Sequence, residues 1–451
     1  MRTIFLLLLC SVVVASACVA DSIPILDAKH ISATALDNGL RIVVKEATDA
    51  PVVSLALNVK VGTLYEDPQT NGISHFVEHL LFESEMPSGA GERKLGPVIE
   101  GMGGVISAST TRDFTTVTIT VTPDSVDAIL PLLAKTAFES KFTDKEITEV
   151  RAVIKREISD RQIAADAYLD QVVWGLAFTK HPYRFPIGGE PEGLDKFTVD
   201  ALQSFYDRFY IPNNMSIVAC GNVKADAFVM QCKQAFGKYL RKEADWRLPD
   251  PEPPQTSPRI KVEPRQAPQT LLAYAFHAPA IASKRDVCAT DLIYSMLGEG
   301  EDSLLKRKLQ DEKQLVKGVD VDFITHKMPG LLVISAVCDP RQELPARQAI
   351  LDVASSLATN RVSDEQLARA KRLIYVSYAF QNEACADQVG SMSFYESIDT
   401  YQFAVDYMDE VNRVTPEDIL RVAKACLRPD SYSLVVLRSE APAPGQEACL
   451  Q

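Results

Sequence analysis

The chain has 451 residues, of which 46% are hydrophobic and 24% charged, a composition typical of a globular protein. This length is too great for one compact core, so two or three domains are expected. The formal net charge of −13 argues against nucleic acid or an anionic membrane surface as a partner.

Residues 1–20 have the pattern of a secretory signal peptide. Arg2 supplies a short positive start, residues 4–14 are mostly apolar, and residues 15–17 form an A-x-A cleavage site. Because the apolar run is too short to span a membrane, we expect export, with the periplasm as the compartment. Cys18 directly follows the cleavage site and leaves open a second interpretation, a lipoprotein anchored to the membrane through that cysteine.

Three stretches in the first half predict β-strands. Asn38-Gly39 is a turn signal ahead of apolar residues 40–44, and apolar side chains alternate through residues 53–61. Residues 105–121 are rich in β-branched side chains, which favour strands. A Pro/Gly/Ser-rich loop is expected at residues 87–91.

Between the second and third of these stretches, residues 71–83 read NGISHFVEHLLFE. On a helix, positions i, i+3 and i+4 share one face, so His75, Glu78 and His79 would lie together among apolar neighbours. Buried imidazoles and a carboxylate are costly unless something binds them, and Zn²⁺ suits two histidines with a glutamate left to act on water. The H-x-x-E-H order is that of the inverzincins. The alternative is a polar helix face satisfied by solvent or by other protein groups.

Two amphipathic helices should follow, over residues 126–137 and over 143–158, the second beginning at the good capping residues Thr143-Asp144. A catalytic zinc ion usually has three protein ligands and one open position. The second helix offers a third ligand, and from spacing alone Glu157 is only moderately favoured over Glu149 and Glu146.

In the order of these motifs, the chain resembles the pitrilysin/insulysin family of zinc peptidases over nearly its whole mature length. The shared features are the helix 72–82, the strand after Gly103-Gly104, the helix 153–158, and the segments His181-Pro182-Tyr183, Pro186-Ile187-Gly188 and Pro212-Asn213-Asn214-Met215. The short members are the most similar, namely bacterial processing-type peptidases and the catalytic subunit of the mitochondrial processing peptidase.

This resemblance implies roles for particular residues. Glu157 takes the position of the third zinc ligand, although its interval from His79 (157 − 79 = 78) is slightly longer than is usual in the family. An assisting glutamate is common two turns earlier, where this chain has Val150 with Glu149 beside it.

The resemblance also implies a peptide-binding strand at Ser107, Ala108 and Ser109, where relatives pair with an extended substrate by β-augmentation. Ser107 replaces the asparagine that is usual in the family.

The second half of the chain is a degenerate copy of the first. Residues 142–154 match 362–374 (362 − 142 = 220), and residues 198–218 match 415–435 (415 − 198 = 217). At the first offset Glu157 falls on Ser377, and the second half has no H-x-x-E-H, so this copy should keep the fold and lack the metal.

Composition sets the domain boundaries. Residues 244–262 form a Pro-rich, stiff linker between a zinc-binding catalytic domain (21–243) and a homologous domain without metal (263–440), with a tail at 441–451. Strands and amphipathic helices alternate in both halves, which predicts an α+β fold. We expect two homologous domains, each a mostly antiparallel sheet with helices packed on one face, that together enclose a cleft.

Relatives usually carry an arginine and a tyrosine in the second half that reach the substrate. Those positions hold Gln310 and Lys317 here. The chain therefore resembles the zinc-bearing member of a split pair, weakly active alone. Its expected partner is a homologous subunit with the Arg/Tyr pair, or a second copy of the chain.

Seven cysteines beyond the signal segment are scattered and show no C-x-x-C pair. They favour small buried hydrophobes over a disulfide framework or a thiolate zinc site. Taken together, the sequence predicts an exported zinc metalloendopeptidase acting on short or unfolded peptides. The alternatives are a catalytically idle scaffold subunit of a peptidase-like heterodimer and a non-enzymatic metal- or peptide-binding protein.

Overall fold

The computed structural model describes residues 25–82, 95–243, 247–265 and 268–438. The signal segment with Cys18, the loop at 87–91 and the tail lie outside these residues. Within the described ranges, no helix combines the length and apolar character needed to cross a membrane.

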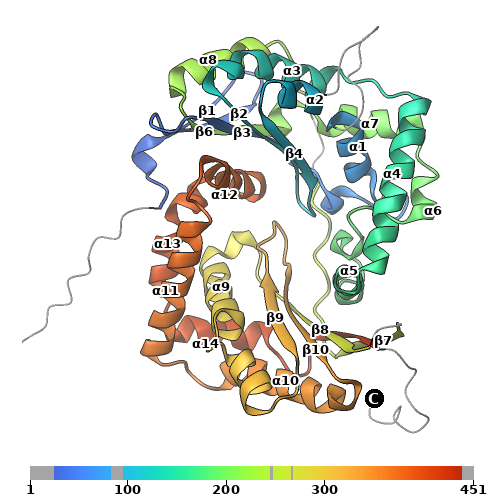
Figure 1. Ribbon diagram of the computed structural model, residues 1–451, viewed down its shortest axis with the longest axis vertical. Helices are drawn as coiled ribbons and strands as arrows, with labels where there is room; N and C mark the ends of the chain where they lie inside the picture. The colour runs from blue at the N-terminus through green and yellow to red at the C-terminus, as the bar shows by residue number, and fades with distance from the viewer. Residues whose placement is uncertain (1–24, 83–94, 244–246, 266–267, 439–451) are drawn as a thin grey trace, which may run out of the picture.

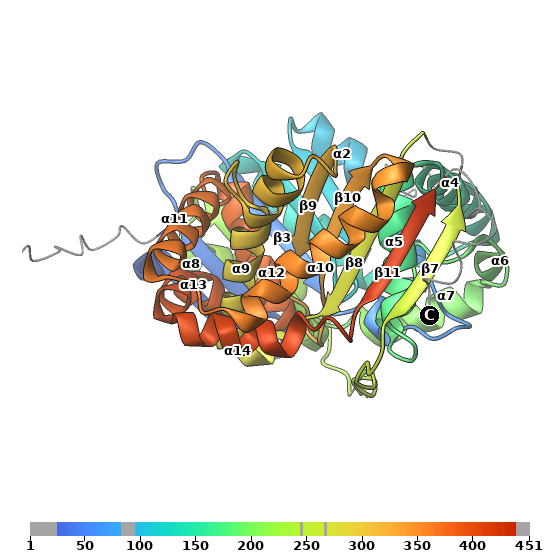
Figure 2. The same ribbon diagram turned by 90° about the horizontal axis from the view of Figure 1, so that it is seen from below.

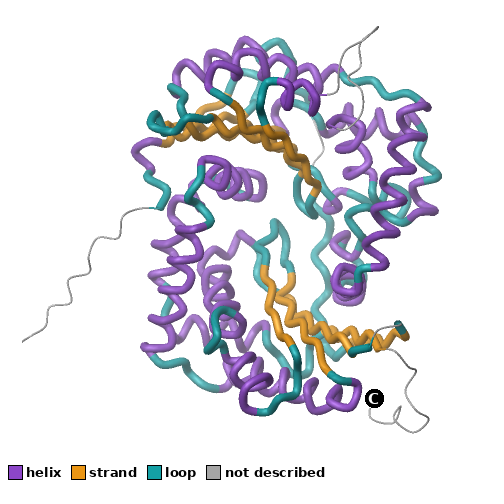
Figure 3. Tube along the Cα trace, viewed as in Figure 1, coloured by secondary structure: helices purple, strands orange, loops and turns teal. Residues whose placement is uncertain are grey.

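Two β-sheets form the framework (Figures 1 and 3). The first has the order β1-β2-β6-β3-β5-β4 and the second the order β7-β11-β8-β10-β9. The strands of the first sheet are β1 (Ile31–Ala35), β2 (Arg41–Glu46), β3 (Val53–Val59), β4 (Val105–Thr110), β5 (Thr115–Val121) and β6 (Met215–Gly221). The strands of the second are β7 (Arg259–Pro264), β8 (Thr270–His277), β9 (Gly318–Phe323), β10 (Leu331–Cys338) and β11 (Ser433–Arg438).

Apart from β1, which only the first sheet has, strand pairing is the same in both sheets. β2 pairs in parallel with β6, and β7 pairs in parallel with β11, whereas the other neighbouring strands are antiparallel. The mostly antiparallel α+β fold is therefore confirmed. Strand β7 begins at Arg259, inside the range expected for the linker.

The helices repeat as well. The first half contains α1 (Ile73–Phe82), α2 (Leu95–Gly101), α3 (Val126–Glu139), α4 (Asp144–Ile163), α5 (Ala165–Ala177), α6 (Pro191–Leu194), α7 (Val199–Phe209) and α8 (Ala225–Phe236). The second contains α9 (Lys284–Gly298), α10 (Glu343–Thr359), α11 (Asp364–Phe380), α12 (Cys385–Ile398), α13 (Gln402–Arg413) and α14 (Pro416–Cys426). α4 and α11 begin 220 residues apart (364 − 144), each behind a capping box, and α7 and α14 begin 217 apart (416 − 199).

Each half covers a sheet of the other. α12 lies on β3 and β6 of the first sheet, and α5 lies on β8 and β11 of the second (Figures 1 and 2). Alternate strand residues point to opposite faces. Leu55 and Leu57 of β3 therefore join the first half's own core, while Ala56 joins the core around α12. Ala273 and Ala275 of β8 likewise face α5.

Buried polar contacts fix both exchanged helices. The Glu396 carboxylate on α12, whose side chain is 1% exposed, accepts hydrogen bonds from the Arg41 guanidinium on β2. The carbonyl of Ala177, at the end of α5, accepts from Arg259 and from His277 Nε2 at 3.1 Å. The last carbonyls of a helix have no partner within the helix, so the second half completes this end of α5.

Glu252 attaches the linker to the turn after α5. Its carboxylate accepts from the main-chain N–H groups of Thr179, Lys180 and His181 at 2.7–2.9 Å and from the Thr179 hydroxyl at 2.6 Å. Although burial opposes ionisation, these hydrogen bonds lower the pKa of Glu252 from its ordinary 4.5 to about 2.

This shift predicts a pH-dependent contribution to stability. Because the folded-state pKa is depressed, the contribution is complete above pH 4.5 and is lost as the pH falls toward 2. We expect Glu252→Gln to lower the free energy of unfolding at pH 7 by about 1–3 kcal/mol, and the difference from wild type to shrink below pH 4.5. Denaturant unfolding between pH 7 and 3 measures it. The exposed Glu243→Gln is the control, and a difference independent of pH would contradict the assignment.

Candidate metal centre

Helix α1 is buried along its whole length. It packs against β4 and β5 and against helices α4 and α7. His75, Glu78 and His79 are only 7%, 4% and 3% exposed, whereas Phe76 and Val77 enter the core of the first half. The expected helix is confirmed, and its polar face is not a solvated one.

A buried carboxylate holds the beginning of this helix. Glu66 accepts from the main-chain N–H groups of Gly72 (2.8 Å) and Ser74 (3.0 Å) and from the Asn71 side chain (3.0 Å). The first N–H groups of a helix have no partner within it and attract negative charge. Burial raises the pKa of Glu66, and these donors oppose the rise. Sequence reasoning missed Glu66, because it precedes the helix and no helical spacing points to it.

The loop that carried the His-Pro-Tyr and Pro-Ile-Gly motifs lies against the same helix end. Pro186 accepts from the Asn71 side chain at 2.9 Å. Gly72 has a φ of +91°, and a Cβ atom there would lie 2.7 Å from the Cα atom of Gly189. Backbone therefore packs directly on backbone, which requires glycine at both positions.

The structure brings together His75, His79 and Glu157. The two Nε2 atoms are 3.2 Å apart, and Glu157 Oε2 lies 3.8 Å from that of His75 and 3.6 Å from that of His79. Ligands at roughly 2.0–2.1 Å from a tetrahedral ion are about 3.3 Å apart, so these atoms fit three corners of a zinc-sized site. Among the residues that the structure describes, it is the only such group of histidine, cysteine and acidic side chains.

The other two candidate ligands point elsewhere. Glu146 completes the capping box with Thr143, and Glu149 is 65% exposed beside Lys145. Val150 is buried in the core, so α4 offers no assisting carboxylate at that position.

Glu78 is held by the strand that ends beside it. The Thr110 hydroxyl, at the last residue of β4, donates to Glu78 Oε2 at 2.6 Å. β4 is the edge strand of the first sheet and pairs there with β5. Ser107 and Ser109 are exposed along it and Ala108 is half-buried. The expected substrate strand thus leads to Glu78, and Thr110 is a site residue that sequence reasoning missed.

The second half reaches the turn that follows Thr110. Asp113 accepts hydrogen bonds from the Tyr183 hydroxyl, from His326 Nδ1 at 2.7 Å and from the main-chain N–H of Lys327 at 3.3 Å. Burial opposes ionisation, but the charge of His326 and these hydrogen bonds lower the pKa of Asp113. The neighbouring Arg112 guanidinium lies 3.9 Å above the Trp174 ring.

The corresponding region of the second half is a cavity of about 610 Å³ between α9, α11 and α12. Ser377, the counterpart of Glu157, lines it together with Asp291. Gln310 and Lys317, where the family resemblance implies an arginine and a tyrosine, contact each other: Gln310 Nε2 donates to the carbonyl of Lys317 at 2.8 Å.

Comparison with known sequence families finds two matches in successive parts of the chain. Residues 41–189 match the family described as insulinase (peptidase family M16), and residues 196–374 match the one described as the peptidase M16 inactive domain. The chain belongs to the M16 family. The second match begins at residue 196, within the first half, and extends into the second half, which has no H-x-x-E-H.

Full-length relatives support this membership. The uncharacterized zinc protease YmxG of Bacillus subtilis is 23% identical over 401 residues, 89% of this chain and 96% of that protein. The zinc protease PqqE of Helicobacter pylori is 25% identical over 419 residues, 91% of this chain and 93% of its own length.

Solved structures confirm the two-domain M16 fold. A protease from Helicobacter pylori superimposes with a TM-score of 0.83 at 22% identity, covering 90% of this chain and 99% of that one. A Pseudomonas fluorescens protein described as a peptidase M16 inactive domain gives a TM-score of 0.81 at 18% identity, covering 91% and 98%.

The metal centre predicts different effects for two glutamates on α4. We expect Glu157→Gln to weaken Zn²⁺ binding by at least about tenfold, because it replaces an anionic donor at the cluster. Glu149→Gln removes the same charge from the same helix and should leave affinity unchanged. Competition with a chromophoric chelator measures both. Equal affinities in the two variants would exclude Glu157 as a ligand.

Proposed function

We propose that this M16 chain is an exported zinc metalloendopeptidase that cleaves short or unfolded peptides. The observation that carries the proposal is the donor triangle of His75, His79 and Glu157, with Glu78 on the same buried helix face. The names of the relatives, zinc proteases from several bacteria, support it.

The chemistry follows from the positions of these side chains. A Zn²⁺ ion held by His75, His79 and Glu157 would polarise the scissile carbonyl and lower the pKa of a water molecule toward about 7. Glu78 would accept the proton of the attacking water and pass it to the leaving amine nitrogen. The hydrogen bond from Thr110 orients the Glu78 carboxylate for both transfers.

Strand β4 suits an extended substrate. A peptide that adds to this edge would pair with the main chain at Ser107, Ala108 and Ser109 and then pass beside Glu78. Main-chain pairing carries little sequence information, in keeping with a broad peptide substrate class. Ser107 in place of asparagine leaves a shorter polar side chain at this edge.

A partner completes the proposal. Gln310 and Lys317 occupy the positions where relatives carry the Arg/Tyr pair, so a homologous subunit or a second copy of this chain would supply that pair. Residues 1–20 would direct export to the periplasm, with Cys18 as an optional lipid anchor. The alternative, an idle scaffold subunit, is disfavoured because this chain keeps the complete H-x-x-E-H motif.

The decisive variant is Glu78→Gln, which keeps the size of the side chain and removes its basicity. We expect cleavage of a mixed peptide pool to fall by about 10²–10⁴-fold, with zinc content unchanged. Mass spectrometry of the products and metal analysis measure the two effects. Equal cleavage by both proteins would refute the assigned base. Zinc-loaded wild type that cleaves nothing, even with a candidate partner, would favour the scaffold alternative.

Thr110 gives a second test with a conservative control. Thr110→Val removes the donor to Glu78, and we expect kcat to fall by about 10–100-fold while KM and zinc content stay close to wild type. Thr110→Ser keeps the hydroxyl and should recover most of the rate. A Val variant with normal kcat, or a Ser variant as slow as Val, would show that the hydrogen bond does not position Glu78.

A further inference from the structure

Two cysteines from different halves of the chain lie where the exchanged helix α12 packs on the first sheet. Cys220 lies in β6, inside the first sheet, and is fully buried, whereas Cys385 is the first residue of α12 and is half-buried. Both are free thiols separated by 165 residues of sequence (385 − 220).

The side chain of Gln388 connects the two cysteine positions. α12 packs on β6, and the Cys220 thiol donates to Gln388 Oε1 at 3.2 Å. Gln388 lies three residues after Cys385, so both residues lie on the helix face that meets β6. Burial, together with the nearby Cys385, raises the pKa of Cys220 to about 12.

The surroundings of the two cysteines are small side chains on the sheet and an exposed turn before the helix. A disulfide requires Cβ atoms about 3.5–4.5 Å apart. The sheet residues beneath α12 are small, Ala56 and Val218 among them. Cys385 follows a turn whose residues Glu383 and Ala384 are exposed, so this end of α12 has solvent rather than packed core on one side.

We propose that Cys220 and Cys385 are a disulfide-forming pair that ties α12 covalently to the first sheet under oxidising conditions. The proposal rests on the proposed export for its setting, since disulfides persist in oxidising compartments. It assigns a role to two thiols that lie at the contact between the halves in a chain without a disulfide framework.

The oxidant is a small-molecule disulfide such as oxidised glutathione. The Cys385 thiolate attacks one sulfur of the oxidant, which forms a mixed disulfide and releases one reduced thiol. The Cys220 thiolate then attacks the Cys385 sulfur, which forms the protein disulfide and releases the second thiol. The protein loses two protons and two electrons, and the oxidant takes up both. Only the thiolate attacks, and burial raises the pKa of Cys220. The second step should therefore be faster at alkaline pH, where more of this thiol is ionised.

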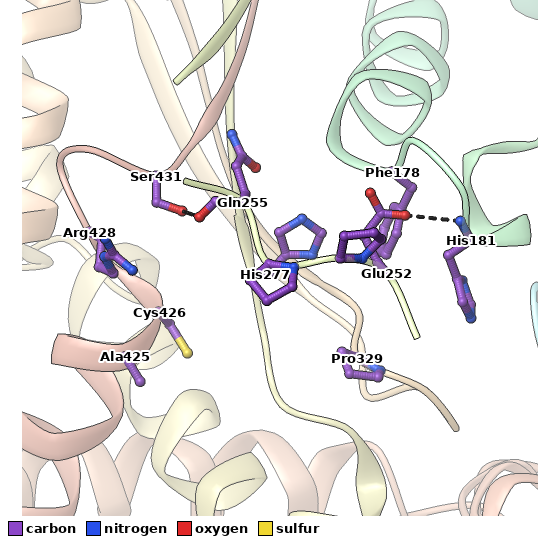
Figure 4. A pocket seen from close by; sticks show the side chains of 12 residues that line it. Phe178, His181, Glu252, Gln255, His277, Pro329, Ala425, Cys426, Arg428 and Ser431 are labelled. Carbon is purple, nitrogen blue, oxygen red and sulfur yellow. Dashed lines mark hydrogen bonds between the residues drawn. The ribbon is translucent and has the colours of Figure 1, made fainter. Parts of the chain in front are cut away.

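Another cysteine provides a matched control. Cys426 is also half-buried, but it lines a separate cavity of about 230 Å³ near Pro329 and Arg428, and no other cysteine lines that cavity (Figure 4). Its burial raises the pKa of the thiol, as for Cys220, so the two sites differ chiefly in having a second thiol at hand.

The test is oxidation of the purified, reduced chain with glutathione disulfide, followed by alkylation and non-reducing peptide mapping. We expect a cross-linked peptide pair containing Cys220 and Cys385 in wild type and in Cys426→Ser, and none in Cys385→Ser. The midpoint of thermal unfolding should rise by several degrees on oxidation of the first two proteins and stay constant in the third, because the bond closes a long loop.

Recovery of both cysteines as alkylated thiols after oxidation would overturn the proposal. So would Cys385 that remains a mixed disulfide with glutathione. Neither readout depends on peptide cleavage or zinc content. A failure of the disulfide proposal can therefore be distinguished from a failure of the proposed peptidase activity.

Discussion

Helix α12 of the second half lies on β3 and β6 of the first sheet, and helix α5 of the first half lies on β8 and β11 of the second sheet. Alanine at the contact, as at Ala56 and Ala275, lets a helix approach the strands closely, and the larger residues between them fill each half's own core. The central strands of each sheet are thereby buried on both faces. Removing either half would expose an apolar sheet face of the other, so the two copies form one folding unit.

This exchange explains why a copy without metal donors persists in the chain. The second half supplies α12 to the catalytic half, and with it the buried Glu396 that pairs with Arg41. It also supplies His326, which fixes Asp113 in the turn immediately after Thr110. Thr110 in turn orients Glu78. The second half therefore contacts the turn that follows Thr110, the residue hydrogen-bonded to the proposed base, although that half carries no metal ligand of its own.

The local parts of this arrangement were predictable from the sequence. Helical spacing placed His75, Glu78 and His79 on one face, and the constant offset between halves predicted the repeated helices. Glu66 and Thr110 were not predictable in this way, because each reaches α1 from another element and a hydrogen bond between separate elements leaves no periodic trace. Choosing Glu157 over Glu149 required either the family resemblance or the packing of α4 against α1, since both are charged residues on the same helix.

The sequence also did not predict that each half packs a helix on the sheet of the other half. The pattern of α5, with apolar Leu169, Val173 and Ala177, shows that one face is buried but not which sheet covers it. Helices on one face of each sheet were expected, and they are present. The second covered face became visible only when both halves were placed together, because two similar sheets offer similar apolar surfaces and a single amphipathic helix is compatible with either.

Comparison of the two halves distinguishes the residues that the fold requires from those that the metal site requires. α9 has the place of α1 between consecutive sheet strands, and its buried positions include Val287, Ala289, Leu292 and Ile293. The same architecture thus packs with a helix that has neither histidine nor glutamate in one half, and with two histidines and a glutamate in the other. Burying those three polar groups is unfavourable unless they bind a ligand, and the fold does not require them. Their presence in α1 alone, supported by Glu66, Thr110 and the backbone contact of Gly72 with Gly189, is therefore best explained by chemistry at that helix.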